Sequence, residues 1–110
     1  MGWIATHRFA RIAPRKVRLV TDLIRGMNAN NAVATLKFTN KRAAFFVKRV
    51  LESAMANANE QEASMNRLIV AEARVDGGPI IKRFQPKDRG RAHPIQKKTC
   101  HIVVAVDERE

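Results

Sequence analysis

Apolar residues recur at helical spacing near the start of the chain. Val17, Val20 and Ile24 fall three or four positions apart and define one face of a helix. Pro14 suits the first turn of this helix, because its ring fixes φ and its missing N–H has no helical partner there. Gly26 suits the end, because glycine tolerates a positive φ. We therefore predict a helix between these two residues.

Two further helices are expected in the middle of the chain. The second follows Asn28, whose side chain can cap free backbone N–H groups, and runs toward Phe38. The third follows Asn40, and its apolar residues keep a spacing of three or four over several turns. Its apolar face consists of Ala43, Val47, Leu51, Ala54 and Ala58. This is the most regular helical pattern in the chain.

Runs of β-branched and aliphatic residues predict strands at residues 4–12, 68–75 and 100–106. No internal repeat is present, and no linker rich in Pro, Gly or Ser divides the chain. A length of 110 residues lies near the most common domain size. We therefore expect one domain that contains both helices and strands.

Residues 76–99 join the last two strands and are too long for a structureless loop inside a compact domain. A Gly-Gly-Pro run at 77–79 suits a bulge that redirects an outgoing strand, and residues 88–91 contain turn-forming Asp and Gly. We predict a long hairpin over residues 77–99 with its tip near 88–91. Fully extended arms would reach roughly 35 Å, beyond a body whose radius of gyration should be near ~13 Å.

Basic residues dominate the charge of the chain, with 21 Lys and Arg against 10 Asp and Glu and a net charge of +11. Such a charge repels itself unless a polyanion neutralises it. Most of the cations fall in three clusters, which are Arg8, Arg11, Arg15, Lys16, Arg18 and Arg25; Lys37, Lys41, Arg42, Lys48 and Arg49; and Lys82, Arg83, Lys87, Arg89, Arg91, Lys97 and Lys98. Burying the hairpin cations without partners would be costly, and phosphates would pair with them. The sequence therefore predicts a nucleic-acid partner.

Other compartments fit the sequence less well than the cytoplasm. No apolar run approaches the roughly 20 residues of a membrane-spanning helix, and residues 1–9 lack the apolar stretch of a secretory leader. Cys100 is the single cysteine, so no disulfide can form within the chain. We expect a cytoplasmic protein with no membrane partner.

A catalytic role would have to use Cys100 and the three histidines, His7, His93 and His101. Cys100 and His101 are sequence neighbours, so in a strand their side chains point to opposite faces and cannot form a nucleophile–base pair. The sequence contains no Gly-rich phosphate loop and no His-x-Glu signature. We therefore expect no enzyme activity, no cofactor and no metal site, and we interpret Cys100 as a small buried hydrophobic residue.

Several stretches of the sequence resemble the family of large-subunit ribosomal protein twenty-two, in one order and over nearly the whole chain. The stretches are 12–20 (IAPRKVRLV) and 22–26 (DLIRG) in its opening helix; 39–43 (TNKRA), 50–54 (VLESA) and 56–58 (ANA) in its long helix; and 75–79 (VDGGP), 89–92 (RGRA) and 97–102 (KKTCHI) in its hairpin. Ala13 stands where the family usually has a capping Ser, so we expect the first helix to lack a side-chain cap.

The resemblance implies an α+β fold in which three helices pack on a small three-stranded antiparallel sheet. The globular body would comprise residues 1–76 and 100–110, and a long β-hairpin would protrude from it. The resemblance also implies a structural constituent of the large ribosomal subunit that binds several domains of large-subunit rRNA, contacts neighbouring ribosomal proteins and aids assembly. The hairpin tip would line the nascent-peptide exit tunnel and meet the nascent polypeptide there.

The basic clusters and the family motifs together give two sets of candidate site residues. The residues expected to bind rRNA are Arg8, Arg11, Arg15, Lys16, Arg18, Arg25, Lys41, Arg42, Lys48, Lys97 and Lys98. Those expected at the tunnel-facing hairpin tip are Lys82, Arg83, Lys87, Arg89, Gly90, Arg91 and Ala92.

An architectural DNA-binding protein is the alternative, in which a basic β-arm wraps a duplex and Pro86 or Pro94 wedges into a base step. Such a protein would usually be a symmetric dimer with its cations on one saddle. Here the first helix, the long helix and the hairpin are all basic, which favours burial among several RNA segments and a chain that is not a homo-oligomer. The residues are compatible with a bacterial or an organellar ribosome, and the lack of a transit-like leader favours the bacterial one.

Overall fold

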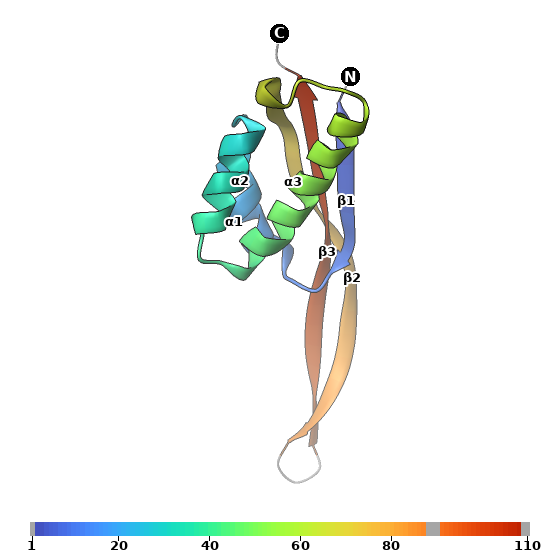
Figure 1. The fold of residues 1–110 in the computed structure, drawn as a ribbon. Coiled ribbons are helices and arrows are strands. Elements are labelled where there is room, and N and C mark those ends of the chain that lie inside the picture. Colours follow the sequence, from blue (N-terminus) through green and yellow to red (C-terminus); the bar gives the residue numbers. More distant parts are fainter. Residues whose placement is uncertain (1, 88–90, 109–110) are drawn as a thin grey trace.

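The computed structural model describes residues 2–87 and 91–108, with side chains for residues 2–79 and 98–108. In this described part, three α-helices cover one face of a three-stranded sheet, and two of the strands continue past the sheet as a hairpin (Figure 1). The elements in chain order are β1 (Trp3–Ala10), α1 (Pro14–Ile24), α2 (Ala29–Phe38), α3 (Arg42–Glu60), the 3-10 helix η1 (Met65–Arg67), β2 (Leu68–Lys87) and β3 (Arg91–Glu108). The predicted α+β class is confirmed.

The sheet is antiparallel throughout, and β3 lies between the other two strands in the order β1-β3-β2. The expected first strand at residues 4–12 is observed as β1, which ends two residues earlier. Its pairing with β3 shifts register between His7 and Ala10, and β2 shifts between Val70 and Glu72. These bulges raise the local twist of the sheet.

The helix ends follow the signals in the sequence. Pro14 is the first residue of α1, and its N-cap residue, Ala13, provides no side-chain cap. Gly26 adopts a φ of +85°, just beyond the last helical residue, and its N–H donates to the Val70 carbonyl at 2.9 Å. At the start of α2 the Asn28 side chain accepts a hydrogen bond from the backbone N–H of Asn30. Each of these predicted features is confirmed.

The core lies between the helices and the covered face of the sheet. All five apolar positions predicted for α3 are buried, and Leu51 has no exposed surface. Opposite them, Ile102, Val104 and Val106 alternate along β3 and are also fully buried. Fully burying a Val, Ile or Leu side chain contributes about 1.5–3 kcal/mol relative to leaving it exposed, so these contacts hold the helices on the sheet.

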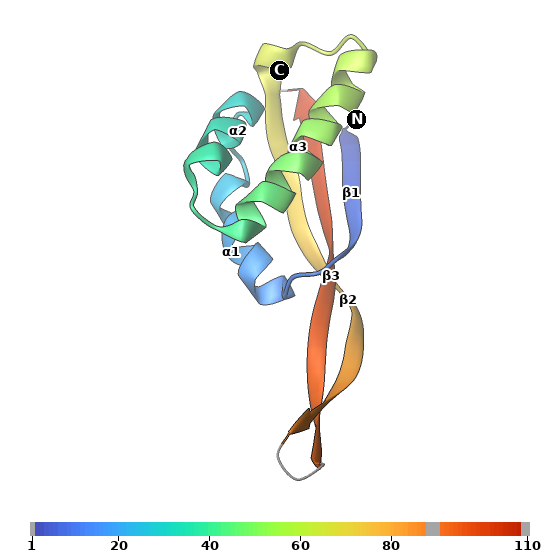
Figure 2. The same cartoon turned by 60° about the horizontal axis from the view of Figure 1, so that its bottom comes forward.

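Beyond the helices, β2 and β3 pair with each other alone, from Ile80 opposite Lys98 to Lys87 opposite Arg91 (Figures 1 and 2). The molecule measures 64 × 24 × 17 Å, and its radius of gyration of 16.9 Å exceeds the ~13 Å of a compact chain of this length. The predicted hairpin is therefore present. Residues 88–90 of its predicted tip lie outside the described residues.

The root of the hairpin is a tight contact between the two strands. The pairing of β2 with β3 shifts between Gly77 and Ile80, as the Gly-Gly-Pro run predicted. A Cβ on Gly78 would lie 2.6 Å from the Thr99 Oγ1 and 3.2 Å from the Thr99 carbonyl carbon. The Thr99 hydroxyl is buried and donates to the Pro79 carbonyl at 2.6 Å. Gly78 therefore allows an approach that any larger residue would obstruct.

Candidate nucleic-acid interface

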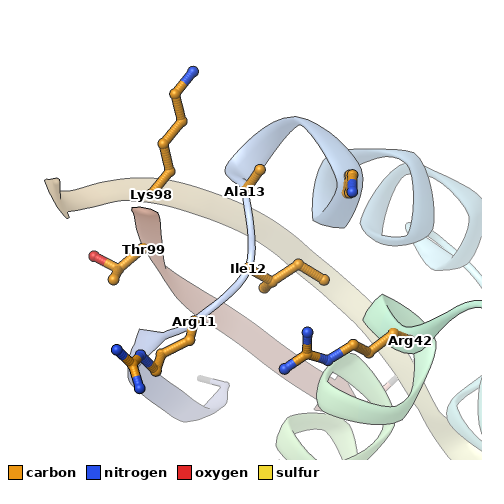
Figure 3. Close-up of a pocket in the computed structure, with 7 residues that line it drawn as sticks. Arg11, Ile12, Ala13, Arg42, Lys98 and Thr99 are labelled. Carbon is orange, nitrogen blue, oxygen red and sulfur yellow. The ribbon is translucent and has the colours of Figure 1, made fainter. Parts of the chain in front are cut away.

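Four basic residues surround an open pocket where the hairpin leaves the body. The pocket has a volume of about 410 Å³, and Ile12, Ala13 and Thr99 complete its lining (Figure 3). The four basic residues are Arg11, Lys16, Arg42 and Lys98. We call this site the root pocket.

The fold brings the root-pocket cations together from four parts of the chain. Arg11 lies between β1 and α1, Lys16 lies in the first turn of α1, Arg42 is the first residue of α3, and Lys98 belongs to β3. Each of the three basic clusters in the sequence contributes at least one of them. The sequence could name these residues, but their meeting place depends on how the helices pack on the sheet.

The helix termini at the root pocket also favour a bound anion. Both α1 and α3 begin at this site, and neither helix has an acidic residue in its first turn or a side-chain cap. The N-terminus of a helix carries partial positive charge and free N–H groups. Lys16 and Arg42 therefore add cations to positions where the helix itself already favours negative charge, and an external anion would relieve that conflict.

Among the described side chains, the root-pocket cations have no carboxylate close enough to neutralise them. Among the side chains that the structure describes, no carboxylate forms an ion pair with Arg11, Lys16, Arg42 or Lys98, whereas ion pairs form elsewhere at Arg25, Lys48 and Arg74. In Figure 3 the Arg42 side chain extends toward Arg11, while the Lys98 ammonium extends away from both. The pocket is thus a concentration of positive charge that the described part of the chain leaves uncompensated.

Three of the residues expected to bind rRNA have partners within the chain. Arg18 donates to the Val75 carbonyl at 3.3 Å, and Arg25 donates to the Ala73 carbonyl, so both tie α1 to β2. Lys48 forms an ion pair of 3.5 Å with a glutamate one turn along α3. Arg18 and Arg25 therefore help to hold α1 on the sheet, whereas the Lys48 ion pair stays within α3.

The other candidates are dispersed along the molecule. Arg8, Arg15 and Lys41 are exposed on the body. The backbone of the hairpin arms contains Lys82, Arg83, Lys87, Arg91, Ala92 and Lys97, and the tip residues Arg89 and Gly90 lie outside the described residues. The grouping of these residues into binding and tip sets stays a prediction.

Reasoning from the sequence missed an aromatic cluster beside the root pocket. Phe45 and Phe46 on α3 each lie under an arginine one helical turn away, at the i, i+4 spacing. This alternation of arginine and phenylalanine is visible in the sequence and could have been recognised as a cation–π pattern.

The side chains of Cys100 and His101 point to opposite sides of β3. Cys100 is fully buried, and burial raises the pKa of its thiol, against a smaller lowering effect of the Arg18 charge. His101 lies on the other face, where its Nδ1 accepts the Phe9 backbone N–H at 3.1 Å. The interpretation of Cys100 as a buried hydrophobic residue is confirmed.

Among the residues that the structure describes, no group of three or more His, Cys, Asp or Glu side chains is placed to hold a metal ion. Among the same residues, no helix is both long and apolar enough to cross a membrane.

A basic α+β body with a projecting hairpin and a cation-lined pocket at its root is typical of a small nucleic-acid-binding protein. A model of the family described as ribosomal protein L22p/L17e matches residues 5–107. Two relatives, both from Thermus thermophilus, are named large ribosomal subunit protein uL22. Each is 53% identical over 106 residues, which cover 96% of this chain and 94% of the relative. The chain therefore belongs to the ribosomal protein L22p/L17e family.

Membership of this family confirms the resemblance seen in the sequence. The chain has a structural role in the large ribosomal subunit, a ribonucleoprotein particle that is cytoplasmic in bacteria. The names of the family and of both relatives describe ribosomal proteins.

Proposed function

We propose that the chain binds large-subunit rRNA through the root pocket and that the hairpin carries the contact further into the rRNA. The observation that supports this most directly is the group of four cations from four parts of the fold that lack a carboxylate partner among the described side chains. Two uncapped helix N-termini beside them add to the attraction for a phosphate. Contacts to several rRNA domains would let the protein aid assembly.

The hairpin is the part of the molecule with the greatest reach. Its tip, at Lys82, Arg83, Lys87 and residues 89–92, is proposed to line the nascent-peptide exit tunnel and to meet the nascent polypeptide. The elongated shape of 64 × 24 × 17 Å and the resemblance of the hairpin motifs support this proposal. On the body, neighbouring large-subunit proteins would be the protein partners, and we expect a single copy of the chain rather than a homo-oligomer.

RNA phosphates match the root pocket because they are anionic and accept hydrogen bonds from its basic side chains. The guanidinium groups of Arg11 and Arg42 can each donate two parallel hydrogen bonds to one phosphate, and the lysines add compact charges. Each phosphate contact releases counter-ions from the RNA, so affinity should fall as salt rises. The steepness of that fall measures how many cations take part.

The test compares binding to a transcript of large-subunit rRNA over a range of salt concentrations. Arg42→Gln should weaken binding and lower the log–log salt slope by about 1, because one phosphate contact is lost. Replacing all four root-pocket cations by Gln should lower the slope by about 3. The matched control is Arg74→Gln, because Arg74 is exposed but paired with Glu72 and Asp76.

Two outcomes would contradict the proposal. One is an Arg42→Gln variant with the same salt slope as the Arg74→Gln control. The other is tighter binding to duplex DNA than to the rRNA transcript at equal salt, which would support the architectural DNA-binding alternative.

A further inference from the structure

Helix α3 carries an exposed aromatic ring close to the root pocket. Phe45 is 55% exposed, whereas its neighbour Phe46 is partly buried and packs on the core. The centres of the two rings are 5.8 Å apart, and the ring planes meet at 73°. The inner ring thus supports the outer one, and the outer one keeps more than half of its surface free.

An arginine lies over each ring. The Arg42 guanidinium carbon is 5.5 Å from the centre of the Phe46 ring, and that of Arg49 is 5.7 Å from the centre of the Phe45 ring. Arg42 also lines the root pocket, so the aromatic cluster lies directly next to that pocket. Positive charge and ring surface therefore alternate along the exposed side of α3.

The other end of the cluster opens into a second basic groove. This groove runs between β1 and α3 and has a volume of about 430 Å³. Arg8 and Arg49 line it, together with His7, whose ring contacts Phe46 edge-on at 5.6 Å. Among the described side chains, neither arginine forms an ion pair with a carboxylate. We call this site the β1–α3 groove.

We propose that an unpaired base of the bound RNA stacks on Phe45. The backbone of the same strand would run from the root pocket to the β1–α3 groove, with Arg42 holding a phosphate on one side of the base and Arg49 on the other. This inference rests on the proposed binding of rRNA and adds that the α3 surface recognises a single-stranded part of that RNA. The base is unpaired because stacking on a side chain requires an exposed ring face, which a base inside a duplex lacks.

RNA fits this surface better than a protein does. Exposed aromatic side chains in a positively charged groove are the elements with which proteins bind single-stranded nucleic acid, since every base has a face to stack and every nucleotide a phosphate. The arginine over the Phe45 ring adds a cation–π contribution. A protein partner would have to bring carboxylates to both ends of the cluster and an apolar side chain between them.

The experiment measures how the purified full-length protein binds two fluorescent oligoribonucleotides, hepta-adenosine and the same length with abasic central nucleotides. Phe45→Leu should bind hepta-adenosine at least about fivefold more weakly, because one base loses its aromatic partner. Binding to the abasic oligonucleotide should not change, since the phosphate contacts remain. Phe45→Trp should bind hepta-adenosine at least as tightly as the wild type does, because the larger ring also stacks.

Phe38→Leu is the matched control. Phe38 is 88% exposed at the end of α2 and belongs to neither basic site, so its loss should leave both affinities unchanged. The thermal unfolding of the Phe45 variants should match that of the wild type, because the ring is mostly exposed.

The outcomes separate this inference from the proposed function. If the wild type fails to bind the rRNA transcript, the proposed function itself is wrong. If the wild type binds the transcript but Phe45→Leu has the same affinity for hepta-adenosine as the wild type, the stacking role is wrong. It is also wrong if Phe45→Leu loses the same affinity for both oligonucleotides. Normal RNA binding by Phe45→Leu, together with failure to enter reconstituted large subunits, would identify a protein as the occupant and would also overturn the inference.

Discussion

The strands β2 and β3 form one continuous antiparallel ladder that has two different surroundings. In the body half, from Leu68 to Gly77 on β2, helices cover one face of the ladder and β1 flanks it. In the hairpin half, from Ile80 to Lys87, the two strands pair with each other beyond the helices (Figure 2). The backbone pairing is alike in both halves, so the difference between them lies in what surrounds it.

Surroundings decide which half is stable by itself. Val70, Val75, Ile102 and Val104 of the body half are buried under the helices. The hairpin half has no third strand or covering helix in the described part of the chain, and its sequence is rich in Lys and Arg. Two-stranded hairpins without such cover are marginally stable in water. We infer that the body folds through its own core, whereas the hairpin half has no comparable core within the described part of the chain.

The largest effect on stability is expected from a change in the core of the body. Leu51→Ala should lower the free energy of unfolding by about 2–5 kcal/mol, because it removes a fully buried side chain and leaves a cavity between α3 and the sheet. Urea unfolding followed by the fluorescence of Trp3, which packs against the core, measures this loss. Leu51→Met preserves volume and should cost less than about 1.5 kcal/mol. Equal losses in the two variants would show that the cavity is not the cause.

An intermediate effect is expected at the root of the hairpin, where the two halves meet. Gly78→Ala should destabilise the protein by about 1–3 kcal/mol, because the new Cβ would press on both the side chain and the backbone of Thr99. Cys100 pairs with Gly77 in the same ladder, so the reactivity of its thiol shows whether the two strands separate at this point.

The Cys100 thiol should react slowly with iodoacetamide in the wild type. It is buried, and burial raises its pKa, so little thiolate is available near pH 8. Gly78→Ala should accelerate the alkylation by opening the root. An alkylation rate equal to that of the wild type would mean that the strands absorb the Cβ without separating.

Much of the body could be predicted from the sequence because its signals are local. Pro14, Gly26 and Asn28 mark helix ends through their own backbone or side-chain chemistry, and the apolar spacing of α3 identifies its buried face. The exact start of α3 was less predictable, because Lys41 occupies its N-cap position and provides no side-chain cap. The signal at Asn40 therefore placed the start one residue too early.

The candidate site was predictable in composition but not in arrangement. The sequence identified Arg11, Lys16, Arg42 and Lys98 as basic, yet only the packing of α1 and α3 against β3 brings them to one pocket. Conversely, Arg18 looked like its neighbours in the sequence, whereas its guanidinium group faces a β2 carbonyl. Partners that are distant along the chain decide between these roles, and no local pattern records them.

The smallest effect on stability is expected from shortening the hairpin. Residues 86–92 can be replaced by a two-residue Asn-Gly turn, because Gln85 pairs with His93 and would then flank a tight hairpin turn. If the hairpin half contributes little to the core, the free energy of unfolding of the body should change by less than about 0.5 kcal/mol in the same urea experiment. Binding to the rRNA transcript through the root pocket should persist, with a lower salt slope because three cations of the sequence are removed. A loss of stability comparable to that of Leu51→Ala would mean that the two halves of the ladder fold as one unit and would remove the distinction between them.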